Sequence, residues 1–512
     1  YEQGSNAYHI PMVYQLTTTA NKEALTQALH ALVKRHEVLR TIFKTNKENQ
    51  YYQSVLKAPA VIKEKSFTNK NQLEKAIKAD VNTPFDLLKS GPTRIVLYSL
   101  KAQNQKNTKD KQCTYLLINI HHIASDGWSD DVLQRDLLAL YQHFDQNQPL
   151  SLPKLEIQYK DFATWQRNYL KGKRLTKQLE YWKAQLEGFE TLQIPTDKPR
   201  PPELSYQGDN LFHELDANLS KQLRALANQH EISLYTLLLS AFYVMLAKWS
   251  GQDDIVIGGI TANRHYPGVK DLIGFFVNTQ VLRQKVDPNI EFNSLLSQVK
   301  QHLIDVQRYQ DLPFEMLVDA LDITRDLSRH PIFQVSFVVQ SFGQEAHQDS
   351  NGIFEPKSTI DPHYDIAKFD LELFVDDAQE KLQLCFNYAT SLFNQETIQR
   401  AASFYQRVLE QLAEDSSRLI QLILNVKMIE IIDLKNDFKA LPDPSKKDYT
   451  SVLKPGTKIK SPDEVNYDYS NDYFRKIIFQ TINLEYLKLK RPNHIRAFFS
   501  AEDKWKGTYL VP

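Results

Sequence analysis

A proline-rich segment near the middle of the chain limits how the sequence can fold. Residues 194–209 (IPTDKPRPPELSYQGD) hold four prolines, and proline lacks the backbone N–H that helix interiors and central strands require. We therefore expect no regular structure in this segment and place the junction between two lobes there. The chain has 512 residues, which is too long for one ordinary domain and favours two or three units with sizeable cores.

The part before this segment alternates helix and strand patterns. Residues 93–100 and 113–120 are short apolar runs rich in β-forming residues and predict two strands. Residues 129–144 predict an amphipathic helix that Ser129 or Asp130 could cap. An earlier helix within residues 20–39 has an apolar face that should pack on a sheet: Leu25, Ala28, Leu29, Leu32 and Val33.

The part after the segment repeats this alternation. Helix patterns cover residues 234–251, 292–309 and 394–415, and strand patterns cover residues 254–262, 331–342 and 369–389. The chain is therefore expected to be α/β, or α+β. Two tandem lobes of this kind would form a cleft between them.

These patterns also predict the domain boundaries. We place the first lobe at residues 1–175, a connecting helix with the proline-rich linker at 176–209, and the second lobe at 210–440. Residues 441–512 are rich in Lys, Asp, Asn and Tyr with weak periodicity, and we interpret them as a linker or a poorly ordered tail.

Composition excludes several classes of protein. The 62 basic and 62 acidic side chains cancel, and no basic stripe with interleaved aromatic residues occurs, so we expect no nucleic-acid partner and no membrane partner. Two cysteines exclude a disulfide scaffold and a cysteine-rich zinc site. The sequence shows no long apolar span and no secretory leader, and we expect a cytoplasmic protein. Neither a Walker-type loop nor a GxGxxG loop is present, which disfavours nucleotide binding.

Two adjacent histidines lie where a predicted strand gives way to a predicted helix. In INIHHIASDGWSDDV (118–132), His121 and His122 precede Asp126 and Gly127. Adjacent residues of an extended segment point to opposite sides, so the two imidazoles are badly placed to bind one metal ion. His122 and Asp126 could still bind a metal, but no third ligand lies at a diagnostic spacing. We therefore assign no metal site.

A serine hydrolase is a further alternative for this stretch, because Ser125 and Ser129 lie nearby. The sequence has no G-x-S-x-G elbow, so this alternative ranks below acyl transfer without a covalent enzyme intermediate. Asp126 can hold the loop, and Gly127 supplies a backbone geometry or close approach that a Cβ would block. We expect one histidine to face the cleft and the other to pack.

The stretch resembles the HHxxxDG signature of nonribosomal peptide synthetase condensation domains, which belong to the acyltransferase superfamily related to chloramphenicol acetyltransferase. The resemblance covers about residues 5–440. Other segments are similar to the remaining core motifs and landmarks of the family, in the expected order: RHEVLRTIF (35–43), PFDL (84–87), YKDFATW (159–165), IPTDKPRP (194–201), IGFFVNTQVLR (273–283), YQDLPFE (309–315) and RDLSRHPIF (325–333).

The sequence departs from the family pattern in a few places. The first family motif, an Ala-Gln-x-Arg-x-Trp-like segment, should precede SNAYHIP and is not found, so we expect a truncated start. His330 stands where Asn is usual, and Phe162 where Tyr is frequent. The final residues do not resemble the adenylation domain that commonly follows. Because carrier, adenylation and thioesterase motifs are also not found, we do not expect this chain alone to select, carry or release a substrate.

The resemblance implies a fold and an activity. The fold is two tandem chloramphenicol acetyltransferase-like lobes in a V-shaped pseudodimer with a central cleft or tunnel. The activity is amide-bond formation, in which the amine of an acceptor aminoacyl group attacks the thioester of a donor acyl or peptidyl group. No tightly bound cofactor is implied, since 4′-phosphopantetheine arms of donor and acceptor peptidyl carrier proteins present the substrates. An adjacent adenylation domain is a further partner that the resemblance allows, and the unit is expected to be monomeric.

The resemblance also implies roles for the residues of the signature. His122 would deprotonate the amine or hydrogen-bond the tetrahedral intermediate, and both roles stay open. The N–H of Gly127 would stabilise the oxyanion, with a plain turn glycine as the alternative. Asp126 should pair with an arginine, while His121 should point away from the substrate and support the loop. The arginines of the matched motifs are the candidates: Arg35, Arg40 and Arg283.

Other matched positions are assigned to the tunnel or to the junction between the lobes. Tunnel residues are Ser125, Trp128, Asn278 and Thr279, with strand capping as the alternative for the last two. Tyr159, Asp161 and Trp165 are expected to hold the lobes together. SDGWS (125–129) resembles the subtype that joins an L-configured donor to an L-configured acceptor.

Two other functions remain as alternatives. A noncatalytic carrier-docking or recruitment module could use the same fold, although the intact His122, Asp126 and Gly127 argue against it. A free-standing acyltransferase could use coenzyme A or another soluble acyl donor, and the full motif set disfavours it.

Overall fold

The computed structural model describes residues 6–58, 61–101, 113–323, 326–340, 353–354 and 366–424. The chain divides into two compact units, residues 1–416 and residues 417–512. Of the second unit, the structure describes only its start, with helix α12 (Ile420–Leu424). The predicted tail at 441–512 lies outside the described residues, as does Arg325 of a matched motif.

The first sheet has four strands in the order β1-β6-β5-β4. Strands β4 and β5 are parallel, and the other neighbours are antiparallel. The strands predicted at 93–100 and 113–120 are confirmed as β5 and β6. The four strands are β1 (His9–Leu16), β4 (Ile62–Phe67), β5 (Thr93–Leu100) and β6 (Cys113–His121).

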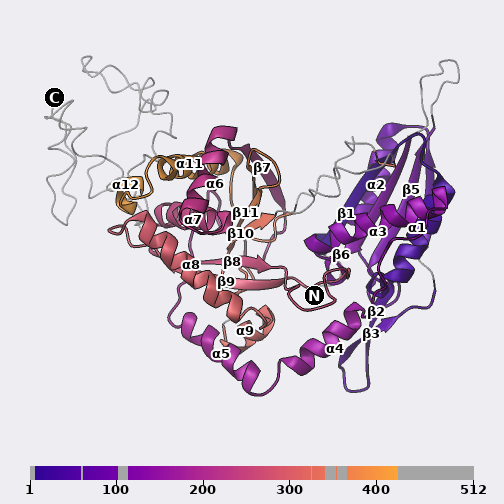
Figure 1. Ribbon diagram of the computed structural model, residues 1–512, viewed down its shortest axis with the longest axis horizontal. Coiled ribbons are helices and arrows are strands. Elements are labelled where there is room, and N and C mark those ends of the chain that lie inside the picture. The colour runs from indigo at the N-terminus through magenta and orange to yellow at the C-terminus, as the bar shows by residue number, and fades with distance from the viewer. Residues whose placement is uncertain are drawn as a thin grey trace, which may run out of the picture. The chain divides into compact units, whose positions relative to one another are not determined.

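Helices cover both faces of this sheet. Alternate β5 residues contribute to two separate cores: Ile95 and Leu97 pack with α1 (Lys22–Arg35) and α3 (Gly127–Gln146), while Val96 and Tyr98 pack with α2 (Lys70–Asn82). Figure 1 shows α1 and α3 side by side over the sheet. Because both faces are covered, β6 is buried from Tyr115 to His121, and Asn119 is the one polar residue between Tyr115 and Ile120.

The second sheet has six strands in the order β7-β12-β11-β10-β8-β9. Strand β10 is parallel to β8 and β11, and the other pairs are antiparallel. The strands are β7 (Gly208–Glu214), β8 (Asp254–Thr261), β9 (Asn278–Lys285), β10 (Val335–Gln340), β11 (Leu371–Asp376) and β12 (Gln383–Ala389). Both sheets mix parallel and antiparallel pairs and pack with helices, which confirms the predicted α/β (α+β) class.

The main helices of this second part pack around one buried helix. Helix α7 (Leu234–Ser250) is buried around its whole circumference, which explains its nearly continuous apolar sequence. It contacts three helices that Figure 1 shows around it: α6 (Ala217–Gln229), α8 (Phe292–Arg308) and α11 (Gln395–Glu414). By length and composition, no single helix in the described ranges could span a membrane, and α6 and α7 meet that test only as a pair bent by 107°.

Shorter elements complete the described part. They are η1 (Asn6–Tyr8), η2 (Glu37–Arg40), β2 (Thr41–Thr45), β3 (Tyr51–Val55), η3 (His122–Ala124), α4 (Tyr159–Tyr169), α5 (Lys173–Gln185) and α9 (Phe314–Ala320). The proline-rich segment is irregular up to Gln207, but β7 begins at Gly208, so the expectation of no regular structure was wrong for its last two residues. The lobe boundaries at 175, 209 and 440 stay predictions.

Candidate functional site

The site lies at the junction of β6 and α3. His121 is the last residue of β6 and is 8% exposed. Its Nδ1 accepts a hydrogen bond from the N–H of Ile123 (3.1 Å), and its ring lies edge-on to Phe85 and His9. His121 is therefore packed among aromatic rings and contacts the turn that follows it.

His122 has a different environment. Its Nδ1 is buried and no other described residue hydrogen-bonds it, while a hydrogen bond of the imidazole to the backbone of His122 itself raises its pKa and so opposes the effect of burial. The ring of Phe275 lies edge to face with the imidazole, with centroids 5.2 Å apart and an interplanar angle of 83°. Burial, together with the nearby ammonium of Lys368, lowers the pKa of His122 to about 4. The imidazole is thus neutral near pH 7 and can accept or donate a hydrogen bond.

Lys368 is a charged neighbour that sequence reasoning missed. It precedes β11, and its ammonium lies 5.7 Å from the centre of the Tyr8 ring, which stacks with His121. Burial lowers the pKa of Lys368, whereas Glu372 raises it. The charge of Lys368 contributes to the lowered pKa of both His121 and His122. A lone lysine before an apolar strand carries no sequence signal for such a role.

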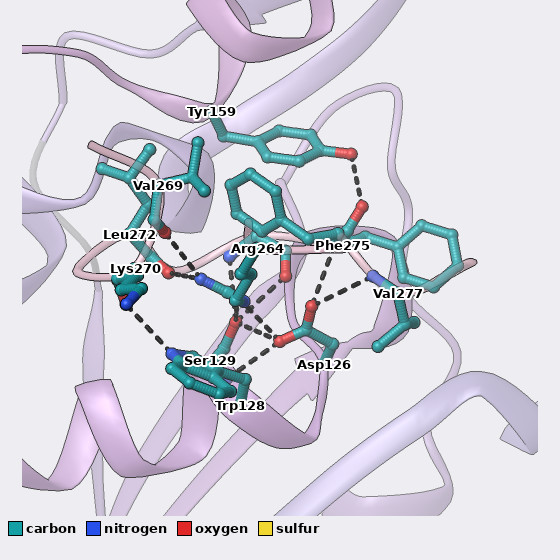
Figure 2. Close-up of polar contacts among 12 residues, drawn as sticks. Asp126, Trp128, Ser129, Tyr159, Arg264, Val269, Lys270, Leu272, Phe275 and Val277 are labelled. Carbon is teal, nitrogen blue, oxygen red and sulfur yellow. Dashed lines mark hydrogen bonds and ion pairs between the residues drawn. The ribbon is translucent and has the colours of Figure 1, made fainter. Parts of the chain in front are cut away.

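The carboxylate of Asp126 binds five donors (Figure 2). It caps α3 by accepting hydrogen bonds at Oδ1 from the N–H (2.9 Å) and Oγ (2.7 Å) of Ser129, where the sequence suggested Ser129 or Asp130 as the cap. Oδ1 also binds Nη2 of Arg264 (2.9 Å). Oδ2 accepts the N–H of Phe276 (2.9 Å) and of Val277 (3.3 Å). Asp126 is 1% exposed, so these donors replace water at a buried charge.

Arg264 is the arginine that pairs with Asp126. It is 4% exposed, and its Nη1 donates to the carbonyls of Val269 (2.9 Å) and Leu272 (2.7 Å). Its Nη2 also donates to Ser129 Oγ (2.8 Å). Arg264 belongs to the loop between β8 and β9, and it thereby ties this loop to the start of α3.

The three arginines expected to pair with Asp126 do not do so. Arg35 donates to Asp136 (2.7 Å). Arg40 donates to backbone carbonyls, including that of Leu56. Arg283 binds Asp254, with Nη2 to Oδ2 at 2.7 Å. The expectation was wrong because the fold pairs each of these three side chains with another acceptor, and Arg264 of the β8–β9 loop takes the place beside Asp126.

The loop of residues 262–277 is fixed at several further points. Trp128 Nε1 donates to the carbonyl of Lys270 (3.0 Å), and the Tyr159 hydroxyl donates to the carbonyl of Phe275 (2.8 Å; Figure 2). Gly274 donates its N–H to Ser129 Oγ (3.1 Å). A Cβ on Gly274 would lie 2.3 Å from Tyr159 Cδ2, so only glycine allows this close approach. The loop is therefore held firmly against α3 and α4.

The structure places the other predicted site residues as follows. Gly127 is the exposed first residue of α3, and it lacks the positive φ of several other glycines. Ser125 is 2% exposed. Asn278 donates to the carbonyls of Gln310 (2.8 Å) and Leu312 (2.7 Å), and Thr279 pairs with Ile260 across β8 and β9. The catalytic and tunnel roles of these residues stay predictions.

Of the residues expected at the lobe junction, two contact the β8–β9 loop. Besides Tyr159, the Trp165 ring lies edge-on to Tyr266 with centroids 4.3 Å apart. Asp161 instead accepts the N–H of Gln158 (2.8 Å) and caps α4. Within the described ranges, no group of three or more His, Cys, Asp or Glu side chains could hold a metal ion.

Comparison with known proteins identifies the family. The condensation-domain model matches residues 1–428. The chain belongs to this family. This condensation domain is 37% identical over 428 residues to malpibaldin synthetase of Mortierella alpina, covering 82% of this chain and 8% of that protein. It is 34% identical over 424 residues to surfactin synthase subunit 1 of Bacillus subtilis (strain 168), covering 82% of this chain and 11% of that protein. The chain thus spans a small part of the length of these curated relatives.

Solved structures share the fold. The X-domain from teicoplanin biosynthesis matches with a TM-score of 0.70 at 24% identity, covering 82% of this chain and 93% of that chain. The condensation domain of the monacolin K polyketide synthase MokA matches with a TM-score of 0.69 at 20% identity, covering 81% and 94%. This likeness confirms the chloramphenicol acetyltransferase-like fold that the resemblance implied.

The Asp126–Arg264 pair generates a stability prediction. The substitution Arg264→Met leaves the Asp126 carboxylate buried without its cation, and we expect the free energy of unfolding to fall by about 3 to 5 kcal/mol. Lys22→Met is the matched control, because the Lys22–Glu64 pair is solvent-exposed and should contribute less than about 1 kcal/mol. Denaturant unfolding measures both, and equal losses for the two variants would contradict the prediction.

The lowered histidine pKa values generate a pH prediction. His121, His122 and His302 have pKa values lowered to about 4, mainly by burial. Between pH 6.5 and 4 the unfolded chain binds protons at these sites that the folded chain does not bind, so stability should decrease as the pH falls through this window. Denaturant unfolding at pH 7 and pH 5 should show a smaller decrease for His122→Gln and for His302→Gln than for the wild type, by on the order of 1 kcal/mol each. If both variants lose as much stability between pH 7 and pH 5 as the wild type does, His122 and His302 are not held neutral in the folded chain.

Proposed function

We propose that this chain forms amide bonds as the condensation domain of a nonribosomal peptide synthetase. The amine of an acceptor aminoacyl thioester attacks the carbonyl carbon of a donor acyl or peptidyl thioester. The new C–N bond forms, the C–S bond breaks, and the amine proton leaves with the thiol. The observation that carries this proposal is the neutral imidazole of His122, which directly follows β6, in a chain of the condensation-domain family.

The relatives support this reaction class. By name they are synthetases and synthases, and they include one of the subunits of linear gramicidin synthase from Brevibacillus parabrevis and bacitracin synthase 3 of Bacillus licheniformis. The chain aligns with 8% and 6% of those two proteins. We infer that it performs one step of such a synthesis.

The low pKa of His122 favours positioning over full deprotonation. An α-amino group has a pKa of about 7.7 to 8.0, whereas the pKa of His122 is about 4. Moving a proton from the ammonium to His122 would therefore cost roughly 5 kcal/mol. We infer that His122 accepts a hydrogen bond from the neutral amine and directs its lone pair at the thioester. It can take the proton only after C–N bond formation has made the nitrogen acidic.

The oxyanion needs its own donor. Gly127 begins α3, where backbone N–H groups have no partner within the helix and the helix dipole favours negative charge. We propose the N–H of Gly127 as this donor. Gly127 is solvent-exposed at this position.

We further propose the partners that this reaction requires. Donor and acceptor carrier proteins present their substrates on 4′-phosphopantetheine arms, and the chain binds no cofactor tightly. The same fold occurs in a four-domain nonribosomal peptide synthetase, where it corresponds to 32% of the solved chain, with a TM-score of 0.69 at 21% identity. We also propose an adjacent adenylation domain as a partner. In addition, we propose a monomeric, cytoplasmic unit. The balance of 62 basic and 62 acidic side chains supports the proposal that it has no nucleic-acid or membrane partner.

The deciding experiment is a condensation assay. The chain is mixed with carriers loaded with donor and acceptor, and the product is measured by mass spectrometry. We expect the substitution His122→Ala to lower the rate by about 10²-fold or more. His302→Gln is the matched control, because His302 is another mostly buried histidine with a pKa of about 4 but lies on α8, and it should keep the rate of the wild type.

Each outcome of this assay has a meaning. Product formation that is unaffected by His122→Ala would overturn the role of His122. No product with any carrier pair would support a carrier-docking or recruitment module. Product from acyl coenzyme A without a donor carrier would support a free-standing acyltransferase.

The stereochemical subtype gives a separate test. Because SDGWS (125–129) resembles the subtype that joins L-configured substrates, we propose a donor with an L-configured terminal residue. Carriers loaded with dipeptidyl donors that differ only in this centre should give product faster for the L form, by about tenfold or more. Equal rates or a preference for the D form would contradict the assignment.

A further inference from the structure

The ring of Phe275 is the exposed aromatic surface next to His122. Phe275 is 38% exposed, although its neighbour Phe276 is 2% exposed and Gly274 is buried. Its ring centre lies 5.2 Å from the centre of the His122 imidazole, edge to face. The β8–β9 loop therefore places a solvent-exposed apolar side chain beside His122, the residue that the proposed reaction uses.

The backbone that carries this ring is fixed on both sides. The carbonyl of Phe275 accepts a hydrogen bond from the Tyr159 hydroxyl (2.8 Å), and the next N–H, that of Phe276, donates to Asp126 (2.9 Å; Figure 2). On the other side, Gly274 donates to Ser129 Oγ (3.1 Å). The ring can change its rotamer, but its Cα cannot move away without breaking buried hydrogen bonds.

Distances connect this ring with the acceptor substrate. A reacting amine must come within hydrogen-bond distance, about 3 Å, of an imidazole nitrogen. The carbon that bears the amine is only about 1.5 Å farther along the acceptor. Since apolar atoms contact one another at about 3.5 to 4.0 Å, a side chain on that carbon comes within reach of a ring centred 5.2 Å from the imidazole.

We propose that Phe275 is a specificity-determining residue that contacts the side chain of the acceptor aminoacyl group and limits its size. This inference rests on the proposed condensation reaction. It adds that the acceptor is selected by whether its side chain fits beside Phe275. Phe275 takes no part in the chemistry, because a phenyl ring neither accepts nor donates the proton. Its effect is on which acceptor can bring its amine to His122.

A series of acceptors tests this role. Carriers loaded with Gly, Ala, Leu, Phe or Trp as acceptor are assayed with one donor, and kcat/KM is measured for each. In Phe275→Ala, the ratio of kcat/KM for the bulkiest acceptors to that for Gly should rise by about tenfold or more, and Phe275→Leu should give an intermediate ratio. Phe212→Ala is the control, because Phe212 is a 74% exposed ring on β7, and its ratio should equal that of the wild type.

The outcomes separate this inference from the proposed function. If the wild type forms product and the ratio in Phe275→Ala stays within about twofold of the wild type, Phe275 does not select the acceptor, while the condensation reaction stands. If Phe275→Ala changes the kcat/KM ratios among donors and not those among acceptors, the assignment of Phe275 to the acceptor is also overturned. If the wild type forms no product, the proposed function fails. In that case the affinities for nonreactive aminoacyl-pantetheine amides of the same five residues are measured. The ratio of the affinity for the bulkiest residues to that for Gly, compared between Phe275→Ala and the wild type, then tests the role of Phe275.

Discussion

The buried carboxylate of Asp126 is the interaction on which the rest of the site depends. A charge that is 1% exposed costs several kcal/mol unless donors replace water, and here Ser129, Arg264, Phe276 and Val277 do so. These donors come from the start of α3 and from the β8–β9 loop. One side chain therefore fixes both the turn that holds His122 and the loop that holds Phe275.

The same burial determines the chemistry available to His122. A site that is dry enough to require full pairing of Asp126 also disfavours a charged imidazole, and the ammonium of Lys368 adds to this effect. Asp126 opposes it, but less strongly. The result is a histidine with little affinity for protons, which suits the orientation of a neutral amine. The full pairing of Asp126 and the low pKa of His122 are thus two consequences of one buried environment.

The sequence predicted the local features of the site but not its long-range contacts. Strand and helix patterns located β6 and α3, because these signals lie within a few residues. The separate roles of His121 and His122 stay predictions, and His122 lies in the turn after the strand. Arg264 was missed, because it lies 138 residues from Asp126 and reaches it only through the return of the β8–β9 loop. Phe275 was missed for a similar reason. Only the fold shows that its exposed ring meets His122.

The groups assigned to the reaction and the side chain assigned to the selection of the acceptor are separate: the first are His122 and the hydrogen-bonded loop, and the second is the ring of Phe275. Backbone bonds to Tyr159, Asp126 and Ser129 hold the loop on either side of Phe275, and none of them uses the phenyl ring. A different side chain at this position would change the surface beside His122 while leaving the capped helix and the loop intact. Because the ring is partly exposed, its replacement leaves little buried cavity and costs little stability. Acceptor preference can therefore change at this position without loss of the groups that position the amine.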